Sequence, residues 1–269
     1  MLIDLHLHTH HSDGVLSPRD LLTAVRKAGV DRFAVTDHDT MRGWAALAGE
    51  VGLIPGVEIT AGHHGREIHI VGLGIDPGNA ALTTLLTNIR ACRIRRLTVL
   101  IDRLPDEVRR GLTMADLASD PAARQSDTLG RLHLAKSLLR RGGIATIGDA
   151  FSQYLGDEHT SDSELEAFPD VADVAACIRT AGGVAILAHP GVYKDLSLIK
   201  VLVSCGLDGI EVNHPNLDPT LHANLLTLAR EQQLLVSSGS DLHFLGRRTP
   251  GEWSLGDAHQ ALLERLAAA

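Results

Sequence analysis

Histidines and acidic residues recur at short intervals near both ends of this 269-residue chain. The first group begins at His6 and His8, and the last ends at Asp241 and His243. Because side chains two residues apart in a strand point to the same side, His6 and His8 can present two imidazoles to one ion. Imidazole and carboxylate ligands without thiolate favour manganese, zinc or iron over monovalent copper or a structural zinc. The spacing therefore predicts a metal centre.

Each of these residues also has an ordinary structural explanation. A single histidine beside an apolar strand is more often a hydrogen-bonded structural residue, and a single aspartate after a strand usually caps the next helix. The whole set is harder to explain in this way, because so many imidazoles and carboxylates packed without metal would leave buried charge uncompensated. We expect two or three ions, with one carboxylate as a bridge. The residues concerned are His6, His8, Asp13, His38, Glu58, His69, His189, Glu211, His214, Asp241 and His243.

Short apolar runs separated by helical patterns indicate the elements that position these residues. Strands that alternate with helices, each apolar along its length, predict a parallel sheet covered on both faces. Seven strands favour a closed α/β barrel, in which the carboxyl ends of all strands face one mouth. The expected strands are Leu2–Leu7, Arg32–Thr36, Leu53–Ile59, Ile68–Leu73, Gly183–Leu187, Gly209–Val212 and Leu234–Ser238.

The middle of the chain, from about Pro77 to Glu166, departs from this alternation and contains only helical patterns. We therefore expect a barrel formed by residues 1–77 and 167–269, with residues 78–166 as a small helical insertion that covers the mouth as a substrate lid. Its expected helices are Ala80–Arg103, Thr113–Leu117, Gly130–Arg141 and Thr146–Tyr154.

Composition restricts the compartment and the partners. The formal net charge of -8 argues against broad nonspecific binding of nucleic acid, and double-stranded DNA is not expected as a partner. Three scattered cysteines are too few for a disulfide framework and indicate reduced thiols in a cytoplasmic protein. The N-terminus lacks the features of a signal peptide, and no apolar run approaches the roughly 20 residues of a membrane span.

Five short motifs, in order along the chain, resemble those of one family. His-Leu-His-Thr is followed by Ser-Asp-Gly, and then by Thr-Asp-His-Asp, Gly-Val-Glu, His-Pro and Ser-Asp-x-His. Together they resemble the polymerase and histidinol phosphatase (PHP) family of metal-dependent phosphoesterases, over about residues 1–75 and 170–245. The resemblance implies a distorted seven-stranded (β/α)7 barrel with a trinuclear metal site.

The same resemblance implies which residues hold which ion. The first ion would be held by His6, His8, Glu58 and Asp241, the second by Glu58, His69 and His189, and the third by Asp13, His38 and His243. Manganese is the expected ion, and iron and zinc accept the same ligands.

Within the family, the insertion resembles that of the nucleotide-phosphatase branch, in Gly130–Lys136 and Ala150–Gly156. This implies removal of the 3′-phosphate from 3′,5′-bisphosphonucleotides such as 3′-phosphoadenosine 5′-phosphate, and 5′-3′ trimming of short 5′-phosphorylated RNA. The acidic segment 157–164 departs from the branch, whose members often carry a basic stretch there. The alternatives are a phosphatase for histidinol phosphate or a cyclic nucleotide, and a noncatalytic metal-stabilised interaction domain.

Residues outside the ligand set supply the remaining hypotheses. Arg131 and His133 are expected to bind a substrate phosphate, since arginine matches phosphate oxygens bidentately, although a solvated helix end is the other interpretation. His214 and a metal-bound water are the candidate general acids for the leaving oxygen. The arginines between Arg90 and Arg110 are interpreted as a solvated helix face or, less simply, as a path for an RNA strand.

Overall fold

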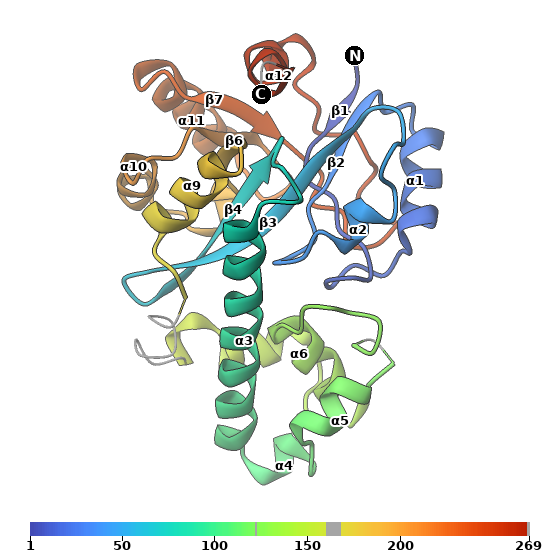
Figure 1. Ribbon diagram of the computed structural model, residues 1–269. Coiled ribbons are helices and arrows are strands. Elements are labelled where there is room, and N and C mark those ends of the chain that lie inside the picture. The colour runs from blue at the N-terminus through green and yellow to red at the C-terminus, as the bar shows by residue number, and fades with distance from the viewer. Residues whose placement is uncertain (122, 160–167, 268–269) are drawn as a thin grey trace.

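Seven strands form a single sheet in chain order, nearly closed into a barrel (Figure 1). The structure is a computed structural model that describes residues 1–121, 123–159 and 168–267. The first and last strands meet just beyond their ends, where the Leu5 N–H donates to the Ser238 carbonyl at 3.2 Å and Leu7 bridges to Leu242. The predicted α/β barrel is thus confirmed. The strands are β1 (Ile3–Asp4), β2 (Arg32–Val35), β3 (Leu53–His63), β4 (Arg66–Leu73), β5 (Val184–Leu187), β6 (Gly209–Asn213) and β7 (Leu235–Ser238).

The prediction of an all-parallel sheet is wrong at one strand. β4 runs antiparallel to both β3 and β5, while the other neighbouring strands are parallel. The reason is the two-residue turn at His64 and Gly65, whose φ angles of 44° and 73° suit a tight hairpin. As a result His69 reaches the mouth from the first half of a reversed strand, paired with Thr60 of β3.

Helices cover the outside of the barrel. The first helix begins where predicted, with Ser17 as N-cap accepting the Asp20 N–H and Pro18 at the first helical position. The last helix covers the end of the barrel opposite the insertion (Figure 1), and its Leu262 joins a core cluster with Ile3, Val71 and Ile186. The covering helices are α1 (Pro18–Lys27), α2 (Arg42–Ala45), α9 (Val171–Thr180), α10 (Leu196–Ser204), α11 (Pro219–Glu231) and α12 (Gln260–Ala267), with short 3-10 turns η3 (Pro190–Val192) and η4 (Gly256–His259).

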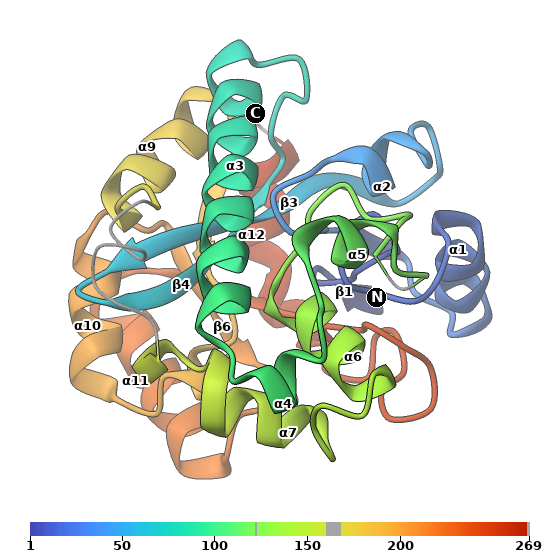
Figure 2. The same cartoon turned by 90° about the horizontal axis from the view of Figure 1, so that it is seen from below.

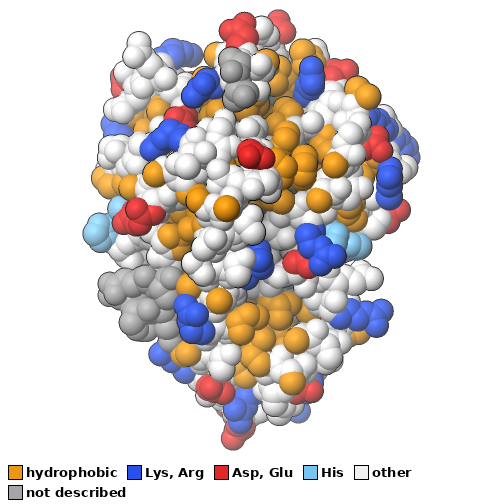
Figure 3. All heavy atoms as spheres, in the orientation of Figure 1, with side chains coloured by type: hydrophobic (Ala, Val, Ile, Leu, Met, Phe, Trp, Pro, Cys, Tyr) orange, Lys and Arg blue, Asp and Glu red, His pale blue; other side chains and the backbone are white. Residues whose placement is uncertain are grey.

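The insertion lies across the end of the barrel away from α12 (Figures 1 and 2), and the molecular surface narrows between the two parts (Figure 3). One long helix joins the two parts: Leu86 and Ile89 in its first half pack into the barrel core, and Leu97 and Ile101 in its second half pack into a separate core with Leu134. The division at residue 78 therefore stays an interpretation. The insertion consists of α3 (Ala80–Arg103), α4 (Asp106–Arg109), α5 (Met114–Ser119), α6 (Arg131–Arg140), α7 (Ile147–Ala150), the π-helix η1 (Phe151–Leu155) and η2 (Asp157–His159).

Candidate metal centre

Glu58 lies at the middle of the candidate site, fully buried on β3. Five imidazole nitrogens surround its two carboxylate oxygens at 2.8–3.2 Å: those of His6, His8 and His38 at Oε2, and those of His69 and His189 at Oε1. Because a carboxylate offers only about four lone-pair sites, these contacts cannot all be good hydrogen bonds. The arrangement suits a carboxylate shared between ions.

Asp241 and Asp13 extend this cluster on the side of β7. Asp241 Oδ1 lies 3.2 Å from His8 Nε2 and 3.3 Å from His243 Nδ1, and Asp13 Oδ1 lies 3.1 Å from His243 Nε2. The close approach of β7 to the first strand depends on Gly239, where a Cβ atom would lie 2.2 Å from the Cβ of His6. All nine predicted ligands thus lie together, and we call them the metal cluster.

The ligand atoms fall into overlapping groups rather than one shell. Three groups formed by the nine predicted ligands have all their ligand atoms within 4.8 Å of one another: His8, Asp13, His38 and His243; His6, His8 and Glu58; and His38, Glu58 and His69. A further group joins His6 to Glu211 and His214. The first three groups share His8, His38 and Glu58, as expected of ions that lie side by side. The assignment of each ligand to one ion stays a prediction.

Unpaired buried atoms test whether the cluster fits a metal. Ligands at 2.0–2.2 Å from one ion lie about 3 Å from each other, which is the spacing found here. Buried polar atoms normally have hydrogen-bond partners. Five buried side-chain atoms at this site have none among the described residues: His8 Nε2, Asp13 Oδ1, His38 Nδ1, His189 Nδ1 and His214 Nε2. The residues present therefore fit bound divalent cations.

The electrostatics show how the metal-free cluster keeps its carboxylates ionised. Burial alone would raise the pKa of Glu58, but His38, His6 and His69 outweigh it and lower that pKa well below its usual range. Burial likewise opposes the charged form of His8, yet the neighbouring carboxylates of Asp241 and Glu58 favour it and raise the pKa of His8 to about 10. Protons and metal ions therefore compete for the same nitrogens.

The backbone carries strain at the same place. Asp39, His189 and Asp241 have φ angles of 52°, 30° and 48°, in the left-handed region that residues other than glycine rarely adopt. Such strain costs of order 1–3 kcal/mol per residue and tends to occur at functional sites. Two of these three residues belong to the metal cluster and the third follows His38.

Comparison with known proteins agrees with this geometry. Residues 4–93 match the PHP domain. A 5′-3′ exoribonuclease from Haemophilus influenzae is 36% identical over 252 residues, which are 90% of this chain and 89% of that protein. The chain belongs to the PHP family.

Further relatives of this PHP protein extend over nearly the whole chain. A 3′,5′-nucleoside bisphosphate phosphatase from Chromobacterium violaceum is 32% identical, over 93% of this chain and 88% of that protein. A phosphoribosyl 1,2-cyclic phosphate 1,2-diphosphodiesterase from Eggerthella lenta is 32% identical, over 93% and 97%. A crystal structure named as a metal-dependent phosphoesterase, from Bifidobacterium adolescentis, is 30% identical with a TM-score of 0.82, over 98% and 96%. The protein is a metal-dependent phosphoesterase.

Two glutamates of the PHP site pair with ligand histidines, and neither pairing was predicted from the sequence. Glu211 accepts a hydrogen bond from His6 Nδ1 at 2.9 Å and another from the His189 backbone N–H, and Glu67 lies 2.8 Å from His69 Nε2. Such partners fix the orientation of ligand imidazoles. Glu67 could have been found, because it precedes His69 by two residues on the same face of the strand.

His214 lies at the edge of the metal cluster. It is 2% exposed, its Nδ1 accepts the Asn216 N–H at 3.2 Å, and its Nε2 lies 3.4 Å from Asp241 Oδ2. A neutral imidazole with this bond at Nδ1 carries its proton on Nε2. Its role as general acid stays a prediction.

Arg131 lies at the mouth but is already paired. Its guanidinium binds Glu67 Oε2 at 2.8 Å and Asp157 Oδ1 at 2.7 Å, and Arg96 pairs with the same two carboxylates. We call Glu67, Arg96, Arg131 and Asp157 the lid network. Of the acidic segment 157–164, residues 160–164 lie outside the described residues.

His133 does not fit the predicted contact with phosphate. It is 1% exposed, its Nδ1 accepts the Gly130 N–H at 3.1 Å, and its Nε2 donates to the Ser12 carbonyl at 3.0 Å. Burial lowers its pKa to about 4, so the ring is neutral. With both nitrogens used inside the protein, His133 instead ties α6 to the loop that carries Asp13.

The arginines of α3 also differ from their sequence interpretations. Arg93 is 8% exposed and pairs with Asp39 Oδ2 at 2.5 Å, and Arg90 donates to the Asp39 carbonyl at 2.7 Å. Arg96, in the lid network, is 4% exposed. Arg93 and Arg96 therefore form neither a solvated face nor an RNA path, and they fasten α3 to the barrel. Among the described residues, no helix is both long and apolar enough to cross a membrane.

Proposed function

We propose that this protein removes the 3′-phosphate of 3′,5′-bisphosphonucleotides such as 3′-phosphoadenosine 5′-phosphate, and that it also trims short 5′-phosphorylated RNA from the 5′ end. The observation that carries the proposal is the cavity of about 140 Å³ that opens on the metal cluster beneath the lid. It is lined by Asp13, His38 and His69 on one side and by Arg131 on the other. This volume is well below the roughly 300–1,000 Å³ of sites for whole small molecules, so it suits a phosphate group.

We propose that two or three divalent ions occupy the metal cluster, with manganese as the usual ion and iron or zinc as substitutes. The mixture of imidazole and carboxylate without thiolate supports this choice. The overlapping ligand groups support more than one ion. When bound, such ions activate a water molecule and neutralise charge on the phosphate.

The protein's own groups have separate roles in this proposal. Glu58 would serve as a ligand to more than one ion, and Glu211 and Glu67 hold the His6 and His69 rings in place. Arg131 binds phosphate oxygens, for which it exchanges one of its carboxylate partners in the lid network. His214 donates the Nε2 proton to the leaving sugar oxygen, which its burial next to Asp241 supports.

The test is a hydrolysis screen with manganese, which measures inorganic phosphate released from the monoesters and, by chromatography, the nucleotides formed from the oligoribonucleotide and cyclic AMP. It compares 3′-phosphoadenosine 5′-phosphate, a 5′-phosphorylated oligoribonucleotide, AMP, cyclic AMP and histidinol phosphate, with Glu58→Gln as the inactive control. We expect turnover of the first two. Turnover of only cyclic AMP or only histidinol phosphate would replace the proposal with one of the alternatives, and no hydrolysis by the metal-loaded protein would overturn it.

We also propose that the protein acts in the cytoplasm on a small nucleotide or short RNA. The three cysteines all lie within the described residues, and none forms a disulfide. Unpaired thiols are usual in reducing compartments. Mass spectrometry of thiol-alkylated protein from cell fractions tests this, since oxidised cysteines in an extracytoplasmic fraction would contradict it.

A further inference from the structure

A second cavity, which we call the side cavity, opens from the metal cluster between α6 and the loop that follows β7. Its volume is about 490 Å³, and its lining includes three predicted ligands: Asp13, Asp241 and His243. The volume falls in the usual range for sites that hold a whole small molecule. A ligand in the side cavity therefore lies within reach of a phosphate bound at the metal cluster.

One part of the side cavity is apolar and carries an exposed aromatic ring. Phe244 is 47% exposed, and Val15 beside the cavity is 58% exposed, while Leu132 and Ile147 come from the insertion. No other Phe, Tyr or Trp among the described residues belongs to the exposed class. An exposed ring beside an anion-binding site offers a surface on which a nucleobase can stack, whatever its sequence.

The cations of the side cavity differ in whether they are free. Lys136 donates to the Asp13 carbonyl at 3.2 Å, and Arg248 binds the Asp241 carboxylate at 3.0 Å. Arg247 is exposed and has no hydrogen bond or ion pair with any residue that the structure describes. A free guanidinium is well suited to bind phosphate oxygens bidentately.

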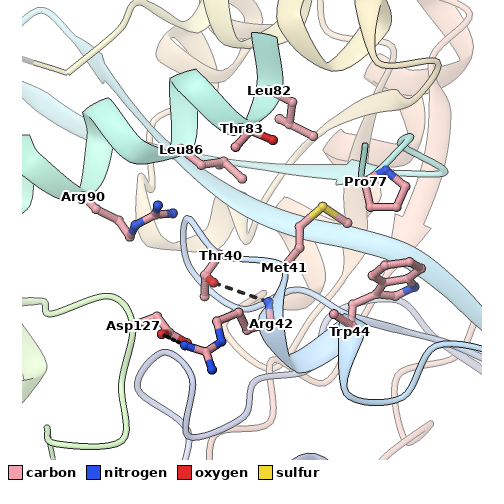
Figure 4. A pocket seen from close by; sticks show the side chains of 11 residues that line it. Thr40, Met41, Arg42, Trp44, Pro77, Leu82, Thr83, Leu86, Arg90 and Asp127 are labelled. Carbon is pink, nitrogen blue, oxygen red and sulfur yellow. Dashed lines mark hydrogen bonds and ion pairs between the residues drawn. The ribbon is translucent and has the colours of Figure 1, made fainter. Parts of the chain in front are cut away.

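Another cavity of similar size makes a useful contrast. It has a volume of about 460 Å³ and also contains an aromatic ring, Trp44, with two arginines (Figure 4). There, however, Arg42 is paired with Asp127 at 2.7 Å and Arg90 with the Asp39 carbonyl. Its lining includes no residue of the metal cluster. The side cavity is thus the better candidate for the remainder of a phosphate substrate.

We propose that the side cavity binds the nucleoside whose 3′-phosphate reacts, with Phe244 stacked on the base and Arg247 bound to the 5′-phosphate of the same nucleoside. This rests on the proposed function. The nucleoside can belong to a bisphosphonucleotide or to the 5′ end of an RNA, and the reaction is the same for both. Water adds to the phosphorus atom, the bond from phosphorus to the 3′-oxygen breaks, and that oxygen takes up a proton. Arg247 is then a specificity residue that requires a 5′-phosphate.

The experiment compares Arg247→Ala with Arg265→Ala, a control at an exposed arginine of α12 at the far end of the barrel. Loss of a charge-assisted contact predicts that Arg247→Ala raises KM for 3′,5′-bisphosphoadenosine about tenfold to hundredfold, with kcat changed by less than about twofold. For adenosine 3′-phosphate, which lacks the 5′-phosphate, both constants should stay within about twofold of wild type. Equal effects on the two substrates, or no effect on the first, would overturn the assignment of Arg247.

Two further measurements distinguish a nucleotide substrate from RNA, and a failure of this inference from a failure of the proposed function. A 5′-phosphorylated and a 5′-hydroxyl diadenylate tell whether RNA is used, and Arg247→Ala should abolish any preference between them. Calorimetric binding of AMP to metal-loaded wild type, Arg247→Ala and Arg265→Ala tests the inference without turnover. If wild type is inactive on every substrate, the proposed function fails; if AMP binds wild type and Arg247→Ala equally, the inference fails. Phe244→Ala should weaken AMP binding severalfold, and unchanged binding would remove the base from the side cavity.

Discussion

The metal cluster and the lid network are both largely buried groups of charged side chains, but they obtain their positive charge differently. In the lid network each carboxylate faces arginine, since Glu67 and Asp157 each pair with Arg96 and Arg131. In the metal cluster Asp13 and Glu58 face imidazoles, whereas Asp241 faces both imidazoles and the guanidinium of Arg248. Arginine is always charged, whereas an imidazole loses its charge near neutral pH.

This difference indicates that the lid network is complete as an all-protein structure, whereas the metal cluster is complete only with protons or divalent ions. Removing one partner of a buried ion pair leaves an uncompensated charge and destabilises strongly. Removing metal from the mouth should have the same effect there and leave the lid network intact. Four experiments test this contrast between the two groups.

Metal removal should have the largest effect. Chelation is expected to abolish phosphate release and to lower stability by about 4 kcal/mol for each ion held at a thousandfold excess over its Kd. For a chain of this size that corresponds to a decrease in Tm of at least about 8 °C. Differential scanning fluorimetry with chelator, and after manganese is restored, measures it. An unchanged Tm with lost activity would mean that the ions serve chemistry and not the fold of the mouth.

Arg96→Ala should destabilise the protein by about 3 kcal/mol, because Arg96 is 4% exposed and its loss leaves Glu67 and Asp157 with one cation fewer. Arg95→Ala is the matched control, since Arg95 is the exposed neighbour on the same helix and its loss should cost less than about 0.5 kcal/mol. Urea unfolding measures both. We expect Arg96→Ala to lower the free energy of unfolding by nearly the same amount with and without manganese. A decrease that disappears when metal is removed would show that the lid network depends on the metal cluster.

Glu67→Gln tests a contact that joins the two regions, because Glu67 pairs with Arg131 and also lies 2.8 Å from the His69 ring. Partners of ligand histidines typically contribute 10–100-fold to metal affinity or activity. We expect a decrease of about tenfold in manganese affinity, measured by calorimetry. Glu107→Gln, an exposed position in the insertion, should leave the affinity unchanged. Equal affinities for wild type and Glu67→Gln would show that the lid does not support the metal cluster.

The sequence was most informative where a local pattern is enough. Each ligand lies in or after an apolar strand, so strand order alone brings His6, Glu58 and Asp241 to one mouth. The direction of β4 could not be read from its apolar pattern, which is the same in either direction, although the His64-Gly65 turn was a usable signal. The partners of the insertion were out of reach, because Arg131 pairs with Glu67 across 64 positions and His133 with Ser12 across 121. Charge patterns along a chain do not indicate such distant pairs.

The smallest expected effect is the pH dependence of stability at His259, a buried histidine with no carboxylate partner among the described residues. It is fully buried, lies 3.1 Å from the Ser238 hydroxyl, and burial lowers its pKa to about 4. Between about pH 4 and pH 6.5, His259 binds a proton in the unfolded chain but not in the folded one. The contribution of His259 to folding stability is therefore fully present above about pH 6.5 and is lost as the pH falls toward 4. From pH 7 to pH 5.5 this amounts to about 1 kcal/mol.

The measurement is urea unfolding of wild type and His259→Gln at pH 7 and pH 5.5, each saturated with metal. Wild type should lose about 1 kcal/mol more than the variant over this interval. If both lose the same amount, His259 is not held neutral by the fold. Burial then would not by itself discharge an imidazole in this barrel, and the imidazoles of the metal cluster could stay charged without their carboxylate partners.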